Sequence, residues 1–145
     1  MSNYTVELTP TAEKVYQKIY EDAQPSIKAG DTTSAKVKML RLVDEAIDTL
    51  IPHDPFSVGN ALAGPLSNTF RVSKGRLRIY YAASSKEHKI VILYISETPR
   101  KAGDANDPYS IFTRMVLSGR FDEVFEKLGV RIPPRQSVLH PPRFQ

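Results

Sequence analysis

KGRLRIYY, residues 74–81, is the stretch that decides the fold expected for this chain. Successive side chains of a β-strand point to opposite faces of the sheet. We therefore expect Arg76, Arg78 and Tyr80 on one face, while Leu77 and Ile79 join a core on the other. The strand would hold the sheet in place and present cations at the same time.

Segments rich in β-forming residues lie on both sides of this strand. Together they predict a three-stranded antiparallel meander, with strands over residues 67–72, 76–83 and 89–96, a turn over 73–75 and a loop over 84–88. The last strand contains IVILYI, residues 90–95, which is apolar in both registers. Such a strand is typical of the centre of a sheet that is covered on both faces.

The N-terminal part predicts an edge strand followed by a helical hairpin. Residues 4–8 alternate like a half-buried strand, and Thr9 and Pro10 suit the cap and first position of a helix that ends near Pro25 or Gly30. A second helix is expected to begin at Thr33 or Ser34 and to end before Pro52. Its predicted buried stripe consists of Leu40, Val43, Ile47 and Leu50.

The C-terminal part predicts two short helices and a tail. After a loop over residues 52–65 and the meander, Asp107 and Pro108 begin a helix that ends at Gly119, with an apolar stripe of Ile111, Phe112, Met115 and Val116. Another helix is expected over residues 121–128. Residues 131–145 contain four prolines and no acid, so we expect an extended tail after a single α+β domain over residues 1–130.

Composition narrows the class of protein. The 145 residues fit one domain with one core, and the chain contains no cysteine, which excludes disulfides, thiolate metal sites and cysteine nucleophiles. No apolar run approaches the roughly 20 residues that span a bilayer. The N-terminal residues lack the pattern of a secretory signal, so we expect a cytoplasmic protein without membrane contact.

The charge is distributed unevenly along the chain. Residues 1–54 carry nine acids and six bases, a net charge of −3, whereas residues 55–145 carry seven acids and fourteen bases, a net charge of +7. No acid occurs between Pro55 and Lys86, so the cations there have no partner nearby in sequence. This pattern favours an external polyanion, with nucleic acid as the expected ligand. A solvated basic surface is the alternative.

The order of these elements resembles the RelE/ParE superfamily of toxins from toxin–antitoxin modules, and within it the YhaV-type toxins. The resemblance covers roughly residues 62–128. Its motifs are residues 62–66 with Phe70-Arg71, the string GRLRIYY over 75–81, the apolar strand over 90–95, and DPYSIF over 107–112 continuing to Gly119. The sequence departs from the pattern at Ala82, where an arginine is usual, and contains no tryptophan.

This resemblance implies a metal-independent endoribonuclease that cleaves messenger RNA, needs no cofactor and is held inactive by a cognate antitoxin. RNA can be cut by its own 2′-hydroxyl when cations stabilise the developing charge and protons are moved. Arginine is too basic to act as a base, so we expect phosphate clamps here. The candidates are Arg78, which matches the second arginine of the motif, and Arg76, Arg71 and Arg100.

The general base is left open by the sequence. Neighbouring cations lower the pKa of a lysine, so Lys74 or Lys101 could serve. Tyr109 is predicted to move a proton or stack on a base, with packing on the sheet as an equal alternative. His53, His88 and His140 share no metal-ligand spacing and are not expected in the site.

Two other functions fit the same fold. A ParE-like toxin would inhibit DNA gyrase and would need only a binding surface. A non-catalytic module that binds nucleic acid would explain why no histidine or carboxylate lies on the predicted basic face. Cleavage of purified RNA by the isolated protein would distinguish the endoribonuclease hypothesis from these two alternatives.

Overall fold

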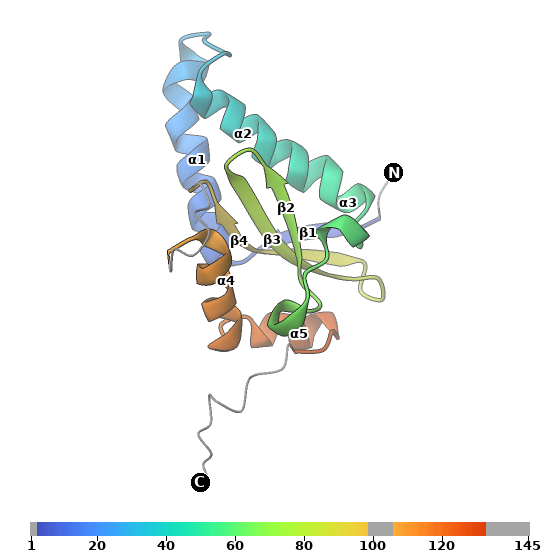
Figure 1. Cartoon of the computed structure of the whole chain (residues 1–145). Helices are drawn as coiled ribbons and strands as arrows, with labels where there is room; N and C mark the ends of the chain where they lie inside the picture. The colour runs from blue at the N-terminus through green and yellow to red at the C-terminus, as the bar shows by residue number, and fades with distance from the viewer. Residues whose placement is uncertain (1–2, 99–105, 133–145) are drawn as a thin grey trace.

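A four-stranded mixed sheet forms the centre of the computed structural model, which describes residues 3–98 and 106–132 (Figure 1). Its strands are β1 (Thr5–Leu8), β2 (Phe70–Lys74), β3 (Leu77–Ser84) and β4 (Lys89–Ser96), arranged in the order β1-β4-β3-β2. The β2–β3–β4 meander is antiparallel, and β1 pairs in parallel with β4. The predicted edge strand, meander and central position of β4 are confirmed, although β2 begins three residues later than expected.

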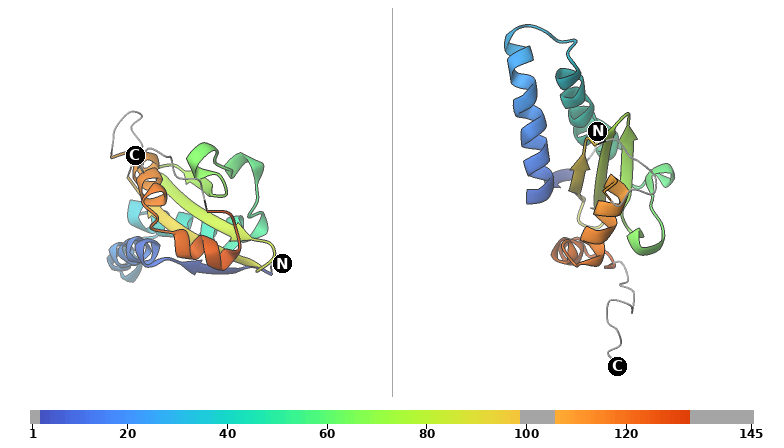
Figure 2. Two further views of the ribbon diagram at one scale, coloured as in Figure 1. Left: turned by 90° about the horizontal axis from the view of Figure 1, so that it is seen from below. Right: turned by 60° about the vertical axis from the view of Figure 1, so that its left-hand side comes forward.

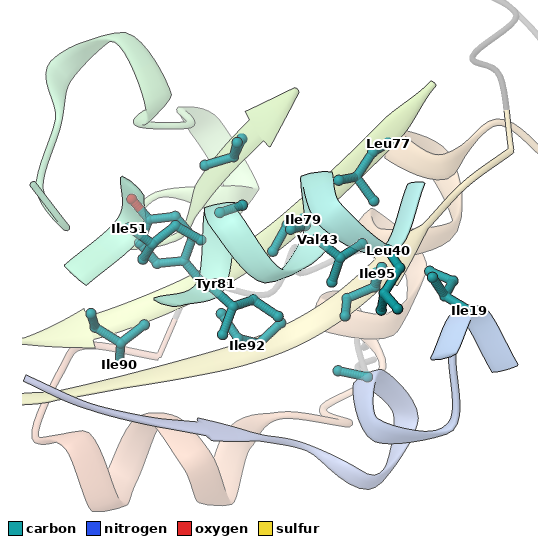
Figure 3. Packing of buried hydrophobic residues seen from close by; sticks show 14 of the residues in the cluster. Ile19, Leu40, Val43, Ile51, Leu77, Ile79, Tyr81, Ile90, Ile92 and Ile95 are labelled. Carbon is teal, nitrogen blue, oxygen red and sulfur yellow. The ribbon is translucent and has the colours of Figure 1, made fainter. Parts of the chain in front are cut away.

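A helical hairpin covers one face of this sheet. It consists of α1 (Pro10–Lys28) and α2 (Ala35–Glu45), and each begins at a predicted cap. The Thr9 hydroxyl accepts a hydrogen bond from the Ala12 amide at 3.1 Å, and Ser34 accepts one from Val37 at 3.2 Å. Figure 3 shows the core beneath the hairpin, where isoleucines of β3 and β4 meet Leu40 and Val43 of α2.

The end of the second helix differs from the prediction. A π-helical turn over Ala46–Leu50 follows α2, and a short α3 (Ile51–His53) continues beyond it. A π turn contains one residue more than the corresponding α-helical turn. The apolar stripe that follows it therefore shifts by one position in the sequence. Leu50, predicted to be buried, is 37% exposed, whereas Ile51 is 1% exposed. The predicted stop before Pro52 is also wrong, since Pro52 lies inside α3. Of the two ends predicted for the first helix, Gly30 is confirmed, because α1 ends at Lys28 and Pro25 lies inside it.

The opposite face of the sheet is covered by α4 (Pro108–Leu117) and α5 (Asp122–Leu128). Both helices were predicted, with Asp107 as the cap of α4 and Gly129, at a φ of 71°, ending α5. The left view of Figure 2 looks onto these helices, with the sheet behind them. Their second core contains Leu66, Tyr80, Ala82, Val91, Leu93, Phe112, Val116, Phe121, Phe125 and Leu128. The face expected to present cations therefore carries a second core beneath these helices.

The connection from α3 to β2 contains two 3-10 turns, Val58–Asn60 and Gly64–Leu66, in agreement with the predicted loop. Residues 133–145 of the predicted tail lie outside the described residues. None of the helices in the described ranges has the length and apolarity needed to cross a membrane.

The π turn can be tested by stability. We expect Ile51→Ala to lower the free energy of unfolding by about 2 to 5 kcal/mol, because it leaves a cavity in the core. Leu50→Ala should cost less than about 1 kcal/mol, as expected for an exposed position. Chemical denaturation of both variants measures the difference. Equal losses would contradict the register that the π turn sets.

Candidate functional site

The turn between β2 and β3 separates two of the predicted site residues. Gly75 has a φ of +58°, which suits the first position of a two-residue hairpin turn. Arg76 lies in this turn and not in β3. Its Nε donates to the Glu97 carbonyl at 2.8 Å, and it lines a hollow of about 440 Å³ with Lys18 and Lys36 of the helical hairpin. The prediction that Arg76 shares a face with Arg78 is therefore wrong.

Two rows of paired residues define the polar part of the opposite face. In the first row, Arg71 of β2 pairs with Tyr80 of β3, which pairs with Tyr94 of β4. In the neighbouring row, Ser73, Arg78 and Ser96 pair in the same way. Directly paired residues of antiparallel strands point to the same face, so both rows lie on the side of α4. We call these six residues the polar rows.

A β-bulge places Tyr94 in the first row. Tyr81 pairs with Ile92 and Tyr80 with Tyr94, so Leu93 is the extra residue in β4. Leu93 and Tyr94 both contact the core under α4, whereas Ile92 packs in the core under the hairpin. Strict alternation would put Tyr94 on the same face as Ile92. The bulge reverses this, as bulges near active sites often do.

Tyr80 forms the buried end of the site. Its side chain is 1% exposed and stacks on Phe112 of α4, with ring centroids 4.3 Å apart. The Tyr94 ring also stacks with Tyr80, with centroids 5.9 Å apart, and lies 6.4 Å from Phe112, so the three rings form one cluster. Burial raises the pKa of the Tyr80 phenol, the Arg71 guanidinium acts in the opposite direction, and Asp107 reinforces the rise. The Tyr80 hydroxyl is therefore a neutral hydrogen-bonding group at physiological pH.

The N-terminus of α4 is fixed beside Arg71. The Asp107 carboxylate, 4% exposed, accepts hydrogen bonds from the Tyr109 amide at 2.8 Å and from the Ser110 hydroxyl at 3.0 Å. These bonds set the first turn of the helix and the position of Tyr109. The Arg71 Cζ atom lies 6.0 Å from the centroid of the Tyr109 ring, at the limit of a cation–π contact.

Arg78 is held by the turn that precedes it. Its Nη1 donates to the carbonyl oxygens of Gly75 and Leu77, at 2.5 and 2.9 Å, and the residue is partly exposed. Within residues 3–98 and 106–132, no carboxylate forms an ion pair with Arg71, Arg76 or Arg78. Arg71 and Arg78 thus share one face and form no ion pair with any carboxylate that the structure describes, an electrostatic environment that suits a phosphate diester.

The structure brings together three of the predicted site residues: Arg71, Arg78 and Tyr109. Lys74 pairs with Leu77, whose side chain lies in the core under the hairpin, so the pleat directs Lys74 to that side. Arg100 and Lys101 lie outside the described residues, as does His140.

The other two histidines lie away from the polar rows. His88 is in the β3–β4 turn and stacks on Tyr4, with centroids 5.7 Å apart, and His53 ends α3. Over the described residues there is no group of three or more histidines and carboxylates arranged to hold a metal ion.

Sequence reasoning missed the part that Tyr94 and Ser96 take in the site. No local signal marks a bulge inside an apolar run such as IVILYI, and strict alternation predicts the wrong face for Tyr94. Asp107 was predicted only as a helix cap; its proximity to Tyr80 depends on how α4 packs on the sheet.

Comparison with known proteins identifies the class of protein to which this site belongs. Residues 7–131 match a family model described as a toxin with endonuclease activity, of a toxin–antitoxin system. This match spans most of the chain, so the protein is an endonuclease toxin. The chain belongs to the YhaV toxin family. The predicted resemblance is confirmed, and of the three predicted functions the description supports the enzyme.

Solved structures of related toxins show partial similarity. The RelBE2 toxin–antitoxin complex from Mycobacterium tuberculosis gives 25% sequence identity and a TM-score of 0.48 over 66% of this chain and 92% of that chain. The isolated RelE toxin of E. coli gives 14% identity and a TM-score of 0.47 over 78% and 98%. The intact E. coli RelBE complex gives 14% and 0.45 over 67% and 99%. No curated protein matches the sequence.

The cap of α4 offers a test of the site's architecture. We expect Asp107→Ala to lower the free energy of unfolding by about 1 to 2 kcal/mol, because the Tyr109 amide loses its acceptor. Asp107→Asn keeps an oxygen acceptor and should cost a few tenths of that. Thermal unfolding compares the two variants. If both lose the same stability, the carboxylate acts through its charge and not as a cap.

Proposed function

We propose that the endonuclease activity of this chain acts on RNA, messenger RNA above all, and that the nucleophile is the 2′-hydroxyl of the substrate. The observation that carries this proposal is the pair of guanidinium groups of Arg71 and Arg78, which form no ion pair with a described carboxylate and lie on a face that also holds three phenols. Messenger RNA as the substrate follows from the resemblance to the RelE/ParE toxins.

The two arginines suit the transition state of such a reaction. When the 2′-oxygen attacks phosphorus, negative charge accumulates on the non-bridging oxygens. Guanidinium groups remain protonated at any physiological pH and can donate two parallel hydrogen bonds to such oxygens. The Nη1 atom of Arg78 is fixed by backbone carbonyls, so its position costs no reorganisation when the charge develops.

Tyr109 and Arg71 together form a surface for an unpaired base. Single-stranded RNA is recognised by stacking of bases on aromatic rings and on guanidinium planes. The Tyr109 ring is partly buried and lies beside the Arg71 guanidinium. A base that stacks here would place its adjacent phosphate near Arg78 in the polar rows.

Two proton transfers complete the reaction. The 2′-hydroxyl loses its proton to water, the P–O5′ bond breaks as the 2′-oxygen bonds to phosphorus, and the leaving 5′-oxygen gains a proton. This chemistry requires neither a metal ion nor a cofactor. Lys74, at the end of β2, would contact a flanking phosphate, while Arg100 and Lys101 remain predictions.

The proposed protein partner is a cognate antitoxin that blocks the polar rows. This follows from the family description, which assigns its members to toxin–antitoxin systems. Since messenger RNA is the proposed substrate, we propose the cytoplasm as the place of action.

Replacement of the arginines tests the site. Removal of one donor that stabilises a developing oxyanion typically costs about 100- to 1000-fold in rate, so we expect losses of this size for Arg71→Ala and Arg78→Ala. Arg76→Ala is the matched control, because its guanidinium lies in the hollow beside the hairpin; a loss of at most about tenfold is expected. Single-turnover cleavage of a purified RNA measures each rate. A loss for Arg76→Ala as large as that for Arg78→Ala would contradict the assignment.

The products identify the nucleophile. Attack by the 2′-hydroxyl leaves a 2′,3′-cyclic phosphate and a 5′-hydroxyl, and cleavage should continue in excess EDTA. A single 2′-deoxynucleotide at the cleaved position should abolish cutting there. Mass spectrometry of the fragments reads the termini directly. A 5′-phosphate, or activity lost to EDTA and restored by Mg²⁺, would show that water is the nucleophile and refute the proposal.

A further inference from the structure

We propose that Tyr94 is the general acid of this nuclease, donating the phenol proton to the leaving 5′-oxygen. The inference rests on the proposed cleavage of RNA and adds a catalytic residue to that site. It begins with position: Tyr94 opposes Tyr80, and Ser96, two residues further along β4, opposes Arg78. Tyr94 and Arg78 are therefore diagonal neighbours, about 7 to 8 Å apart at their backbones and within reach of long side chains.

The β-bulge at Leu93 is the structural feature that creates this position. It directs Leu93 and Tyr94 to the same face, although all other described residues of β4 between Ile90 and Ile95 alternate. The consequence is a phenol on the face that carries Arg71 and Arg78, with Arg78 as its diagonal neighbour, where regular pairing would have placed it under the helical hairpin.

Among the three phenols on this face, Tyr94 is the one suited to give up a proton to a bound substrate. Tyr80 is 1% exposed and closed off by Phe112 at 4.3 Å. The Tyr109 ring lies against the Arg71 guanidinium, in the position proposed for stacking. Tyr94 is partly exposed, and its ring lies 6.4 Å from Phe112 and 5.9 Å from Tyr80, which hold it on the sheet.

The protonation state of the Tyr94 hydroxyl also suits a general acid. Burial raises the pKa of Tyr94 above the usual value of a tyrosine, while an interaction with the Ser96 side chain acts in the opposite direction. The group is therefore protonated at neutral pH and can donate but not accept a proton at the start of the reaction. As the P–O5′ bond breaks, its proton passes to the 5′-oxygen, and water returns a proton to the phenolate afterwards.

A substrate with a sulfur leaving group isolates this role. In an RNA with a 5′-bridging phosphorothiolate at the cleaved position, the leaving group is a thiolate, whose conjugate acid has a pKa of about 8.5 and needs no proton donor. For Tyr94→Phe we expect a loss of about 100- to 10,000-fold on the all-oxygen RNA, the usual range for a general acid. On the sulfur substrate the same variant should cleave at nearly the wild-type rate.

Three further variants test whether the sulfur substrate restores the activity of Tyr94→Phe alone. Arg78→Ala should be slow on both substrates, because it removes stabilisation of the phosphate and not of the leaving group. Tyr109→Phe should show no rescue, and Tyr20→Phe, an exposed phenol on α1, should match wild type on both. Each comparison is a ratio of two rates for the same preparation, so a lower fraction of folded Tyr94→Phe protein does not change it.

The outcomes separate this inference from the proposed function. If wild type cleaves RNA and Tyr94→Phe is equally fast on the oxygen substrate, or equally impaired on both substrates, Tyr94 is not the acid although the RNA nuclease stands. Rescue of Tyr109→Phe in place of Tyr94→Phe would reassign the role. Failure of wild type to cleave either RNA would overturn the proposed function itself.

Discussion

Pairing between β3 and β4 is the constraint on which the rest of the structure depends. These two strands contribute side chains to both cores, one under the helical hairpin and one under α4 and α5. A shift of one residue in their pairing would move the side chains of one strand to the opposite face. If β3 shifted, Ile79 would meet α4 and Tyr80 would enter the core under the hairpin. The same register that buries the isoleucines therefore also aligns Arg78 with Ser96 and Tyr80 with Tyr94.

The charge distribution shows why the site belongs to this face. Some lysines elsewhere in the described structure have acidic partners: Lys18 pairs with Asp22 at 2.8 Å and Lys89 with Glu7 at 3.1 Å. Arg71 and Arg78 share a face and form no ion pair with a carboxylate of residues 3–98 or 106–132. Like charges placed close together destabilise a folded protein. Bound phosphate would remove that repulsion. A phosphate bound to both arginines would therefore gain hydrogen bonds and also cancel the repulsion between their charges. This favours a polyanionic ligand over a neutral one.

The sequence predicts the helices and strands of this fold well, but it predicts less well which face of an element, or which turn, a given residue occupies. Caps at Thr9, Ser34 and Asp107 are local signals, and the apolar run of β4 identifies the central strand; all were confirmed. Arg71, Arg78 and Tyr109 could be named because they follow a motif or begin a helix. The errors have a physical pattern. Arg76 was assigned to a strand although it belongs to the turn, since alternation alone does not show where a hairpin reverses. Tyr94 was missed because nothing in IVILYI marks the extra residue.

Two single-residue insertions explain why the side chains that regular periodicity predicts to be buried differ from those that the structure buries. The π turn after α2 moves burial from Leu50 to Ile51, and the bulge in β4 moves Tyr94 from one face of the sheet to the other. Neither segment contains a glycine or proline that would mark the irregularity in the sequence. Their consequences differ, however. The π turn keeps the core under the hairpin filled, whereas the bulge brings the Tyr94 phenol onto the face that carries Arg71 and Arg78. For this reason the bulge, and not the π turn, is the irregularity that points to catalysis.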